Sequence, residues 1–380
     1  MKNGSPLVLA VAASLAAFSP AAAQGGGAAI PAGEGGEIVQ ASCGSCHGLG
    51  NITGAAGYDE AGWRDLFSSM IALPDAQART VATYLAKNFP AKTARRPTLV
   101  AGPEQVKITE WIAPTLGQRV RDPLQARDGA IWWTGMFASL VGRRDPVTGD
   151  LKECKLPEGS RPHGIAEDPA GNIWFTGNGN GTVGRVDATT GEVKVYKTEA
   201  RDPHTPIFMP DGTLFFTAQG ARMIGRLNPT TGELKEVPTR GANPYGIKRD
   251  SKSTLWIAFN GSAMLASMNP QTMELRYYDL PDPASRVRRL DLTSDDMVWF
   301  VNSARGRIGR LNPQTGEVKE WESPSGPDSH PYAIAVVDDI IWYNESNQRP
   351  DVLVRFDPRT EQFQSFPIPS GYGIVRNMFV

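Results

Sequence analysis

The residues that could do chemistry begin with a cysteine and histidine cluster near the N-terminus. Cys43, Cys46 and His47 stand in the order Cys-Gly-Ser-Cys-His. This C-x-x-C-H spacing is typical of c-type haem attachment, in which two thiols bind the porphyrin edge and the imidazole binds the iron. A thioredoxin-like site would need a βαβ pattern, and a zinc site a second Cys/His pair, which residues 48–100 lack. The spacing therefore predicts haem c, with Cys43 and Cys46 as thioether residues and His47 as an iron ligand.

A second set of reactive side chains recurs along the C-terminal part of the chain, about 40–45 residues apart. Each begins a predicted inner strand of a repeated β unit: Arg121, His163, His204, Tyr245, Arg288, Tyr332 and Tyr372. We expect these positions to crowd at one mouth of a central channel, where Arg376 could join them. A cationic and aromatic ring suits an anionic or polar small-molecule ligand. The alternative is that these side chains only hydrogen-bond around water in the channel.

The elements that must position this ring are short β-strands in repeated units. One unit spans residues 161–196 and has four β-rich runs separated by turns of the D-G, N-P and T-G kinds. Four strands at this period predict propeller blades, and seven inner-strand starts predict a mainly β fold with seven blades. Residues 106–111 match an outermost strand, and residues 373–380 match a last inner strand. We expect them to close the ring together, with the seventh blade incomplete. Either the chain is truncated, which we favour because missing strands leave unpaired edges, or the ring closes poorly.

Three helices are predicted before the repeats, over residues 37–46, 59–70 and 74–89. The second has apolar residues at Trp63, Leu66, Phe67 and Met70, which is the spacing of one helical face. Residues 36–90 resemble a small class I cytochrome c. The resemblance implies that Met70, the one Met between His47 and Ala101, is the distal iron ligand. The alternative is that Met70 only fills space on the apolar face.

The N-terminus predicts export. Lys2, an apolar run over residues 6–17 and Ala-Ala-Ala-Gln at 21–24 have the order of a signal peptide, which indicates a periplasmic protein with no membrane span in the mature chain. We expect a signal peptide over 1–23, linkers over 24–35 and 91–103, a haem domain over 36–90 and a propeller over 104–380. Cys154 is expected to be a small apolar side chain in a strand. The net charge of −1 gives no case for nucleic acid as a partner.

Recurring strings in the repeats carry a family resemblance. Ile-Trp-Phe-Thr, Ile-Gly-Arg-Leu-Asn-Pro and Thr-Gly-Glu-Val-Lys-Glu resemble the virginiamycin B lyase (streptogramin lyase) family over residues 104–380. The resemblance implies a seven-bladed propeller that opens cyclic depsipeptides by elimination at an ester, with Mg²⁺ and a His base. His163 and His204 match the family's two histidines, and Asp202 stands where the family has a metal-binding Glu. The second Glu is replaced by Gln219, and the pair lies in other blades than in the family.

These patterns leave more than one function open. The first is electron transfer through the haem domain, with a possible redox partner protein, coupled to a propeller that binds a small polar or anionic ligand. The alternative is a Mg²⁺-dependent carbon–oxygen lyase that opens a cyclic depsipeptide, with the haem domain as an accessory. A third is a binding platform, because propellers commonly serve as one. A shared fold does not decide between them.

Overall fold

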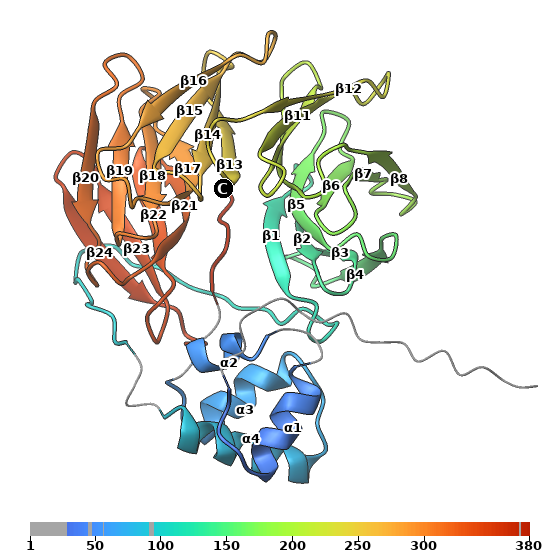
Figure 1. Ribbon diagram of the computed structural model, residues 1–380, viewed down its shortest axis with the longest axis vertical. Coiled ribbons are helices and arrows are strands. Elements are labelled where there is room, and N and C mark those ends of the chain that lie inside the picture. The colour runs from blue at the N-terminus through green and yellow to red at the C-terminus, as the bar shows by residue number, and fades with distance from the viewer. Residues whose placement is uncertain (1–28, 45–47, 56, 91–94, 372–373) are drawn as a thin grey trace, which may run out of the picture.

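The computed structural model describes residues 29–44, 48–55, 57–90, 95–371 and 374–380. The predicted signal peptide, Cys46, His47 and Tyr372 lie outside these ranges. The described residues form a small helical unit followed by a propeller-like set of β-sheets (Figure 1). Within the described ranges, no helix has both the length and the apolar character needed to cross a bilayer.

The helical unit contains α1 Glu34–Ser42, α2 Gly50–Gly54, α3 Glu60–Ser68 and α4 Asp75–Asn88. The carboxylate of Asp59 caps α3 by accepting from the backbone N–H of Gly62 at 2.8 Å. Trp63, Phe67 and Leu85 are buried in a common core. The three predicted helices are confirmed as α1, α3 and α4, although α3 ends before Met70. Met70 therefore lies in the following turn with 43% of its surface exposed, and not on the apolar face.

Six four-stranded antiparallel sheets make up the rest, each with its strands in chain order. The first three are β1 Val120–Gln125, β2 Ile131–Gly135, β3 Leu140–Arg144, β4 Leu151–Lys155; β5 Pro162–Glu167, β6 Ile173–Gly177, β7 Thr182–Val186, β8 Val193–Lys197; and β9 Pro203–Phe208, β10 Leu214–Ala218, β11 Met223–Leu227, β12 Leu234–Pro238. The others are β13 Pro244–Arg249, β14 Leu255–Phe259, β15 Met264–Met268, β16 Leu275–Asp279; β17 Val287–Leu292, β18 Val298–Asn302, β19 Arg307–Leu311, β20 Val318–Glu322; and β21 Pro331–Val337, β22 Ile340–Glu345, β23 Val352–Asp357, β24 Gln362–Pro367. We call these sheets blades one to six.

Repeated turn and packing residues explain why the same strands form in each blade. Asp168 follows β5 and accepts from the indole N–H of Trp174 at 2.9 Å, as Asp250 does from Trp256 at 3.0 Å. The Gly of the Ile-Gly-Arg string is explained by side-chain packing. A Cβ on Gly225 would overlap the ring of Phe216 on the neighbouring strand. The recurring Gly therefore leaves room for an aromatic side chain of the second strand to pack directly against the third strand.

Each inner strand carries an irregularity close to its start. The register of β5 with β6 shifts between Pro162 and Ile165, and the first strands of the other five blades shift at the equivalent place. A bulge re-aims side chains next to it. The residues that begin the inner strands, His163 among them, therefore lie in the irregular stretch that faces the channel. Successive inner strands pack on each other from β1 to β21.

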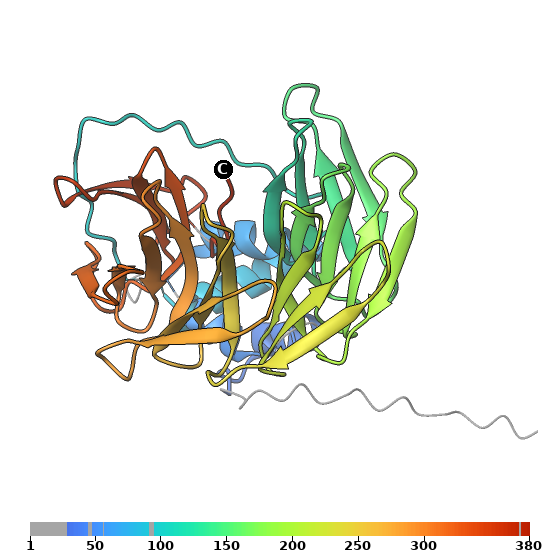
Figure 2. The ribbon, with the colours of Figure 1, turned by 90° about the horizontal axis from the view of Figure 1, so that it is seen from above.

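The ring is completed differently from the expectation. Residues 106–111 and 374–380 are not strands, so the described chain has six sheets, and the seventh blade remains a prediction. Both segments nevertheless lie between blades six and one: residues 374–380 run beside β21 and β1, and residues 95–119 pass outside them (Figure 2). The N–H of Ser365 donates to the carbonyl of Val100 at 2.9 Å, and Thr115 bonds Glu153 of blade one. The crossing segment thus ties the two blades together.

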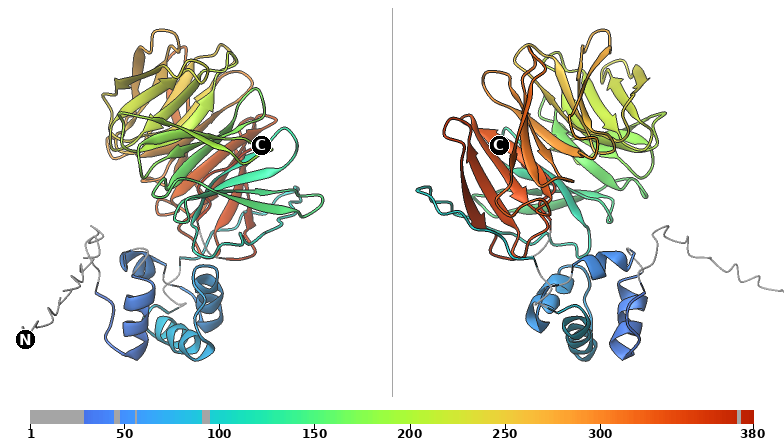
Figure 3. Two further views of the ribbon diagram at one scale, coloured as in Figure 1. Left: turned by 90° about the vertical axis from the view of Figure 1, so that its right-hand side faces the viewer. Right: turned by 60° about the vertical axis from the view of Figure 1, so that its left-hand side comes forward.

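The helical unit lies at one end of the propeller (Figure 3). The N–H of Gly117, just before β1, donates to the carbonyl of Ser69 at 3.1 Å. The guanidinium of Arg349 lies 5.7 Å from the ring centre of Tyr58. Because Pro331 pairs with Glu345, the loop that carries Arg349 is at the end where β21 starts. The helical unit therefore contacts the rim at which the inner strands begin.

Candidate functional site

The predicted ring residues meet at this end of the channel, in two layers. The outer layer, called here the channel mouth, consists of half-buried arginines and one histidine: Arg119, Arg121, Arg288, Arg376 and His330. Arg119 and His330 stand directly before inner strands and have left-handed backbones, each with φ of 53°. The equivalent residues before β5 and β13, Arg161 and Asn243, have the same left-handed backbone, so this conformation belongs to the blade repeat. His330 in turn lies 3.4 Å from Arg288, from its Nε2 to Nη2 of the guanidinium.

The deep layer consists of Asp122, His163, His204 and Arg289, all at most 4% exposed. The ring centroids of His163 and His204 lie 3.6 Å apart, with the ring planes tilted by 35°. Arg289 reaches from β17 to the carboxylate of Asp122 on β1 at 2.8 Å and to the hydroxyl of Thr205 on β9 at 3.4 Å. Burial alone would lower the pKa of Arg289, but the carboxylate of Asp122 raises it. Arg289 is therefore a charged link between three blades.

Two tyrosines lie between the layers and form what we call the phenol pair. The hydroxyls of Tyr245 and Tyr332 share a short hydrogen bond. Arg376 donates to Tyr332 at 3.4 Å, and the guanidinium of Arg288 lies 4.5 Å from its ring centre. Burial acts to raise the pKa of Tyr332, but the charges of Arg376 and Arg288 and the bond from Tyr245 outweigh it and lower the pKa to about 8. Burial raises the pKa of Tyr245, which therefore keeps its proton.

Positive charge dominates the site. Burial, followed by the charge of Arg121, lowers the pKa of Arg119 to about 10, which still leaves it charged at neutral pH. Burial and the neighbouring arginines lower the pKa of His330 to about 4, so it is neutral. The two layers thus hold arginines at 119, 121, 288, 289 and 376 against the carboxylate of Asp122. Such an excess favours an anionic ligand.

Sequence reasoning found one residue per inner strand and missed its neighbour. Asp122 and Arg289 each follow a predicted ring residue, and both reach the channel because the bulge lets two successive side chains point inward. The doublets Arg-Asp and Arg-Arg could have signalled this, because charged residues at strand positions are rarely buried without a partner. Arg119 and His330 lie outside the strands and had no such signal.

The residues expected to hold Mg²⁺ do not fit it. Mg²⁺ prefers oxygen ligands in octahedral geometry. Both carboxylate oxygens of Asp202 accept from backbone N–H groups, those of Gly220 at 2.5 Å and Ala221 at 3.1 Å. The remaining donors of the matched set are the imidazoles of His163 and His204. The described ranges contain no group of three or more His, Cys, Asp or Glu residues that could hold a metal ion.

The described part of the haem motif is compatible with a prosthetic group. Cys43 follows α1 and packs against the helical core, while Cys46 and His47 are outside the described residues. The indole nitrogen of Trp63 is buried in that core and has no acceptor among the described residues. A donor of this kind suits a porphyrin propionate. Cys154 lies in β4 and packs against the core of blade one, as expected for a small apolar side chain.

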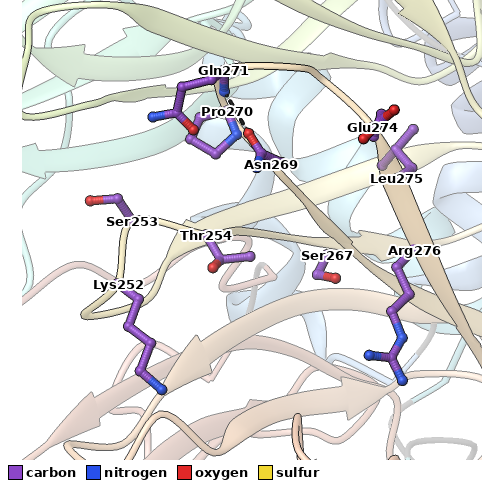
Figure 4. Close-up of a pocket in the computed structure, with 10 residues that line it drawn as sticks. All are labelled: Lys252, Ser253, Thr254, Ser267, Asn269, Pro270, Gln271, Glu274, Leu275 and Arg276. Carbon is purple, nitrogen blue, oxygen red and sulfur yellow. Dashed lines mark hydrogen bonds between the residues drawn. The ribbon is translucent and has the colours of Figure 1, made fainter.

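A groove of about 790 Å³ lies elsewhere, on blade four. It is lined by the turns before β14 and between β15 and β16, where Asn269 accepts from the N–H of Gln271 (Figure 4). These turns are at the opposite end of the strands from the channel mouth. The groove is open and its side chains are ordinary turn residues, so we do not place the functional site there.

The six blades and their central cluster define a propeller-like protein of mainly β structure. Residues 93–349 match the model of the virginiamycin B lyase family, and the chain belongs to that family. Virginiamycin B lyase from Staphylococcus aureus is similar at 23% identity and a TM-score of 0.60, over 66% of this chain and 84% of that one. A catalytically inactive variant of it, solved with quinupristin, is 27% identical with a TM-score of 0.58, over 62% and 80%.

A further similar structure extends the fold beyond this family. Hydrazine synthase from Kuenenia stuttgartiensis matches at 16% identity and a TM-score of 0.52, over 64% of this chain and 80% of that one. At this identity the likeness concerns the fold alone. No curated protein matches the chain significantly.

Proposed function

We propose that the propeller is a carbon–oxygen lyase that acts on an anionic ester at the channel mouth, without the Mg²⁺ ion of the family reaction. Family membership supports the reaction class. The single observation that supports an anionic substrate is the cluster of arginines around the phenol pair. Asp122 is the carboxylate of this cluster, so the arginines outnumber it and leave an excess of positive charge. The cationic mouth would hold a carboxylate group of the substrate and stabilise negative charge that develops next to it during elimination.

Unused donors in the cluster support ligand binding over a purely structural role. The Nε atoms of Arg288 and Arg289 are buried and have no hydrogen-bond partner among the described residues. An unsatisfied buried donor costs about 1–3 kcal/mol, so two in one cluster are expensive unless a ligand or water accepts from them. A carboxylate is acceptor-only and matches these two donors.

The test uses O-acetylmalate, a dianionic ester. Loss of the proton next to one carboxylate forms the C=C bond of fumarate, and the electron pair of the breaking C–O bond leaves with acetate. We expect the full-length holoprotein to release fumarate and acetate, detected by NMR, with EDTA having no effect. Arg288→Gln should raise KM about tenfold or more, because a charge-assisted bond contributes about 1.5–3 kcal/mol. Arg240→Gln, on an exposed arginine of blade three, is the matched control.

A second arm separates this proposal from the family's own reaction. We expect a streptogramin B, with or without Mg²⁺, to remain intact in the mass spectrum, because the donors around Asp202 do not fit the ion. A linearised product that disappears with EDTA would refute the proposal and favour the Mg²⁺-dependent lyase. Equal acetylmalate turnover by the wild type and Arg288→Gln would refute the role of the cationic mouth.

For the helical unit we propose covalent haem c, bound through Cys43, Cys46 and His47, in an exported periplasmic protein. The packing of Cys43 against the helical core and the buried indole of Trp63 support it. Bound haem would supply one-electron transfer, either to or from a redox partner protein or to or from the channel mouth of the propeller. Cys43→Ala should lose covalent haem in a pyridine haemochrome assay, whereas Cys154→Ala should retain it. Wild-type protein without haem would refute this.

The distal ligand of that haem is proposed to be Met70, which lies in the exposed turn next to the rim contact of Gly117. Oxidised wild-type protein should show the weak sulfur-to-iron band near about 700 nm that accompanies His/Met ligation. Met70→Leu should abolish the band while the haem stays covalently attached. A band that is absent from the wild type, or that survives in the variant, would contradict the assignment.

A further inference from the structure

The histidines of the deep layer are poorly placed to act as a base. Burial lowers the pKa of both His163 and His204 well below the usual range, and the charges of Arg121 and Arg289 lower it further. A proton added to either ring would be buried beside Arg121 and Arg289, with the carboxylate of Asp122 nearby, 3.9 Å from Nδ1 of His163. The Nδ1 atom of His204 is in addition engaged with the hydroxyl of Thr205 at 2.8 Å. Each imidazole is therefore a neutral and weak proton acceptor.

Tyr332 occupies the equivalent position in a different blade. His163, His204, Tyr245 and Tyr332 each follow a proline at the second position of an inner strand. In blade six this places a phenol hydroxyl between the deep layer and the channel mouth. The electrostatic environment of a residue, more than its blade, then decides which of these equivalent side chains can take a proton.

We propose that Tyr332 is the general base of the propeller, held as a phenolate by Tyr245 and the surrounding arginines. This inference rests on the proposed lyase function. Tyr245 donates to the phenolate oxygen, Arg376 donates to it from the C-terminal segment, and Arg288 lies over its ring. The lone pair of the phenolate takes the proton from the carbon next to the substrate carboxylate. The C–H electrons form the C=C bond, and the ester oxygen leaves as acetate with its own electron pair.

The charged groups that face Tyr332 from the elements packed around it all shift its pKa in the same direction. The groups that face it are Tyr245 on β13, Arg288 and Arg289 on β17, Arg119 and Arg121 at β1, Arg376 of the C-terminal segment and the neutral His330 of its own loop. Apart from the two neutral groups, all are cations that favour the phenolate. Burial acts in the other direction and raises the pKa of Tyr332, but the surrounding positive charges have the larger combined effect. The pKa of Tyr332 therefore falls to about 8. Tyr332 therefore ionises at a lower pH than an ordinary tyrosine, and its phenolate form gains population as the pH rises above neutral.

A neighbouring pair completes the positioning of the base. Nδ1 of His330 forms a hydrogen bond with the hydroxyl of Ser346 at 2.8 Å. This bond fixes the imidazole ring beside Arg288. Arg288 therefore has a fixed place above Tyr332. Tyr245 is fixed from its backbone side as well, because its carbonyl accepts from the hydroxyl of Thr217 at 2.7 Å. Tyr245, which donates to the phenolate oxygen, and Arg288, which lies over the ring, are thus each held by a neighbouring blade, as preorganised stabilisation requires.

The first experiment needs no substrate. The full-length holoprotein is labelled with ¹³Cζ-tyrosine, and the carbon signals are followed by NMR from about pH 6 to pH 11. We expect one tyrosine of the chain to ionise with a midpoint near 8, its signal to vanish in Tyr332→Phe, and its midpoint to rise in Tyr245→Phe because a stabilising donor is lost. Tyr196→Phe, which removes a hydroxyl bonded to Pro229 in the outer strands, is the control and should leave that signal unchanged. Absence of any tyrosine that ionises near pH 8 would overturn the proposal.

The second experiment separates the base from the lyase reaction. With O-acetylmalate, wild-type kcat/KM should rise with pH to a plateau and be half-maximal near pH 8. Tyr332→Phe should lower kcat at least about a hundredfold, the usual contribution of a general base, with little change in KM. Unchanged turnover in that variant overturns Tyr332 as base while the lyase stands. A wild type without turnover that still has the tyrosine signal near pH 8 overturns the lyase function and with it the role of Tyr332 as its base, while the ionisation of Tyr332 stands.

Discussion

The ion pair between Asp122 and Arg289 makes a quantitative prediction about the propeller. It joins blade one to blade five across the channel, with side chains 2% and 5% exposed. Asp122→Asn keeps the shape of the side chain but leaves the guanidinium charge of Arg289 buried without its counter-ion. Removing one member of a buried pair typically costs about 3–5 kcal/mol. Since Asn can still accept one hydrogen bond, we expect a loss near the lower value, about 3 kcal/mol.

The assay is urea unfolding followed by tryptophan fluorescence, with the free energy taken from the midpoint and the slope. Asp279→Asn, which breaks the exposed pair with Arg240, is the control and should cost less than about 1 kcal/mol. The double variant Asp122→Asn/Arg289→Met removes the buried charge together with its partner, so most of the loss should be recovered. A loss from Asp122→Asn no larger than the control, or a double variant as unstable as the single, would refute this reasoning.

Three further predictions concern other sites. Burial raises the pKa of Asp351 to about 7 in the folded protein, so its carboxyl binds a proton more tightly there than in the unfolded chain. The free energy of unfolding should therefore fall by up to about 4 kcal/mol as pH rises from about 4 to 8. Asp351→Asn should flatten that pH profile, measured by urea unfolding. Gly225→Ala should cost about 1–3 kcal/mol in the same assay, because its Cβ meets the ring of Phe216, and Phe216→Leu should restore part of the loss. Gly117→Ala should free the helical unit from the rim and speed proteolysis between them, since φ is 66° and a Cβ would lie 2.7 Å from the carbonyl of Met70; Gly129→Ala, with φ of 83° and no neighbour within 4 Å, should not.

The fold was predictable where one sequence string has one physical cause. The Ile-Gly-Arg string predicts a third strand because its Gly makes room for an aromatic ring, and this cause repeats in most blades. Residues 106–111 show the limit of such reasoning. Their alternation of apolar and polar residues is that of a strand, but a strand also needs a neighbouring edge, and here the segment instead bonds through Glu110 to the N–H of Ser370. The local pattern of apolar and polar residues does not show whether a neighbouring strand is available for pairing.

The candidate site was predictable in its position and less so in its chemistry. The second position of each inner strand is fixed by the repeat, so the sequence places His163, His204, Tyr245 and Tyr332 together. It contains no indication that Arg289 of blade five reaches Asp122 of blade one, because that contact depends on a bulge and on the width of the channel. The pKa of each group follows from these contacts. The assignment of the base could therefore not be made before the three-dimensional structure.

The near-symmetry of a propeller explains how one family can host different chemistry. Every blade offers the same inner-strand position to the same channel, so a reactive group moved from one blade to another remains at the mouth. What changes is its neighbours. In this chain burial, together with the neighbouring arginines, suppresses protonation of the imidazoles of blades two and three, whereas the charges of arginines promote ionisation of the phenol of blade six against its burial. Burial and one cationic cluster thus disable one kind of base while the cluster activates another, which makes arginine placement, as well as the presence of histidine, the feature to compare among propellers of this family.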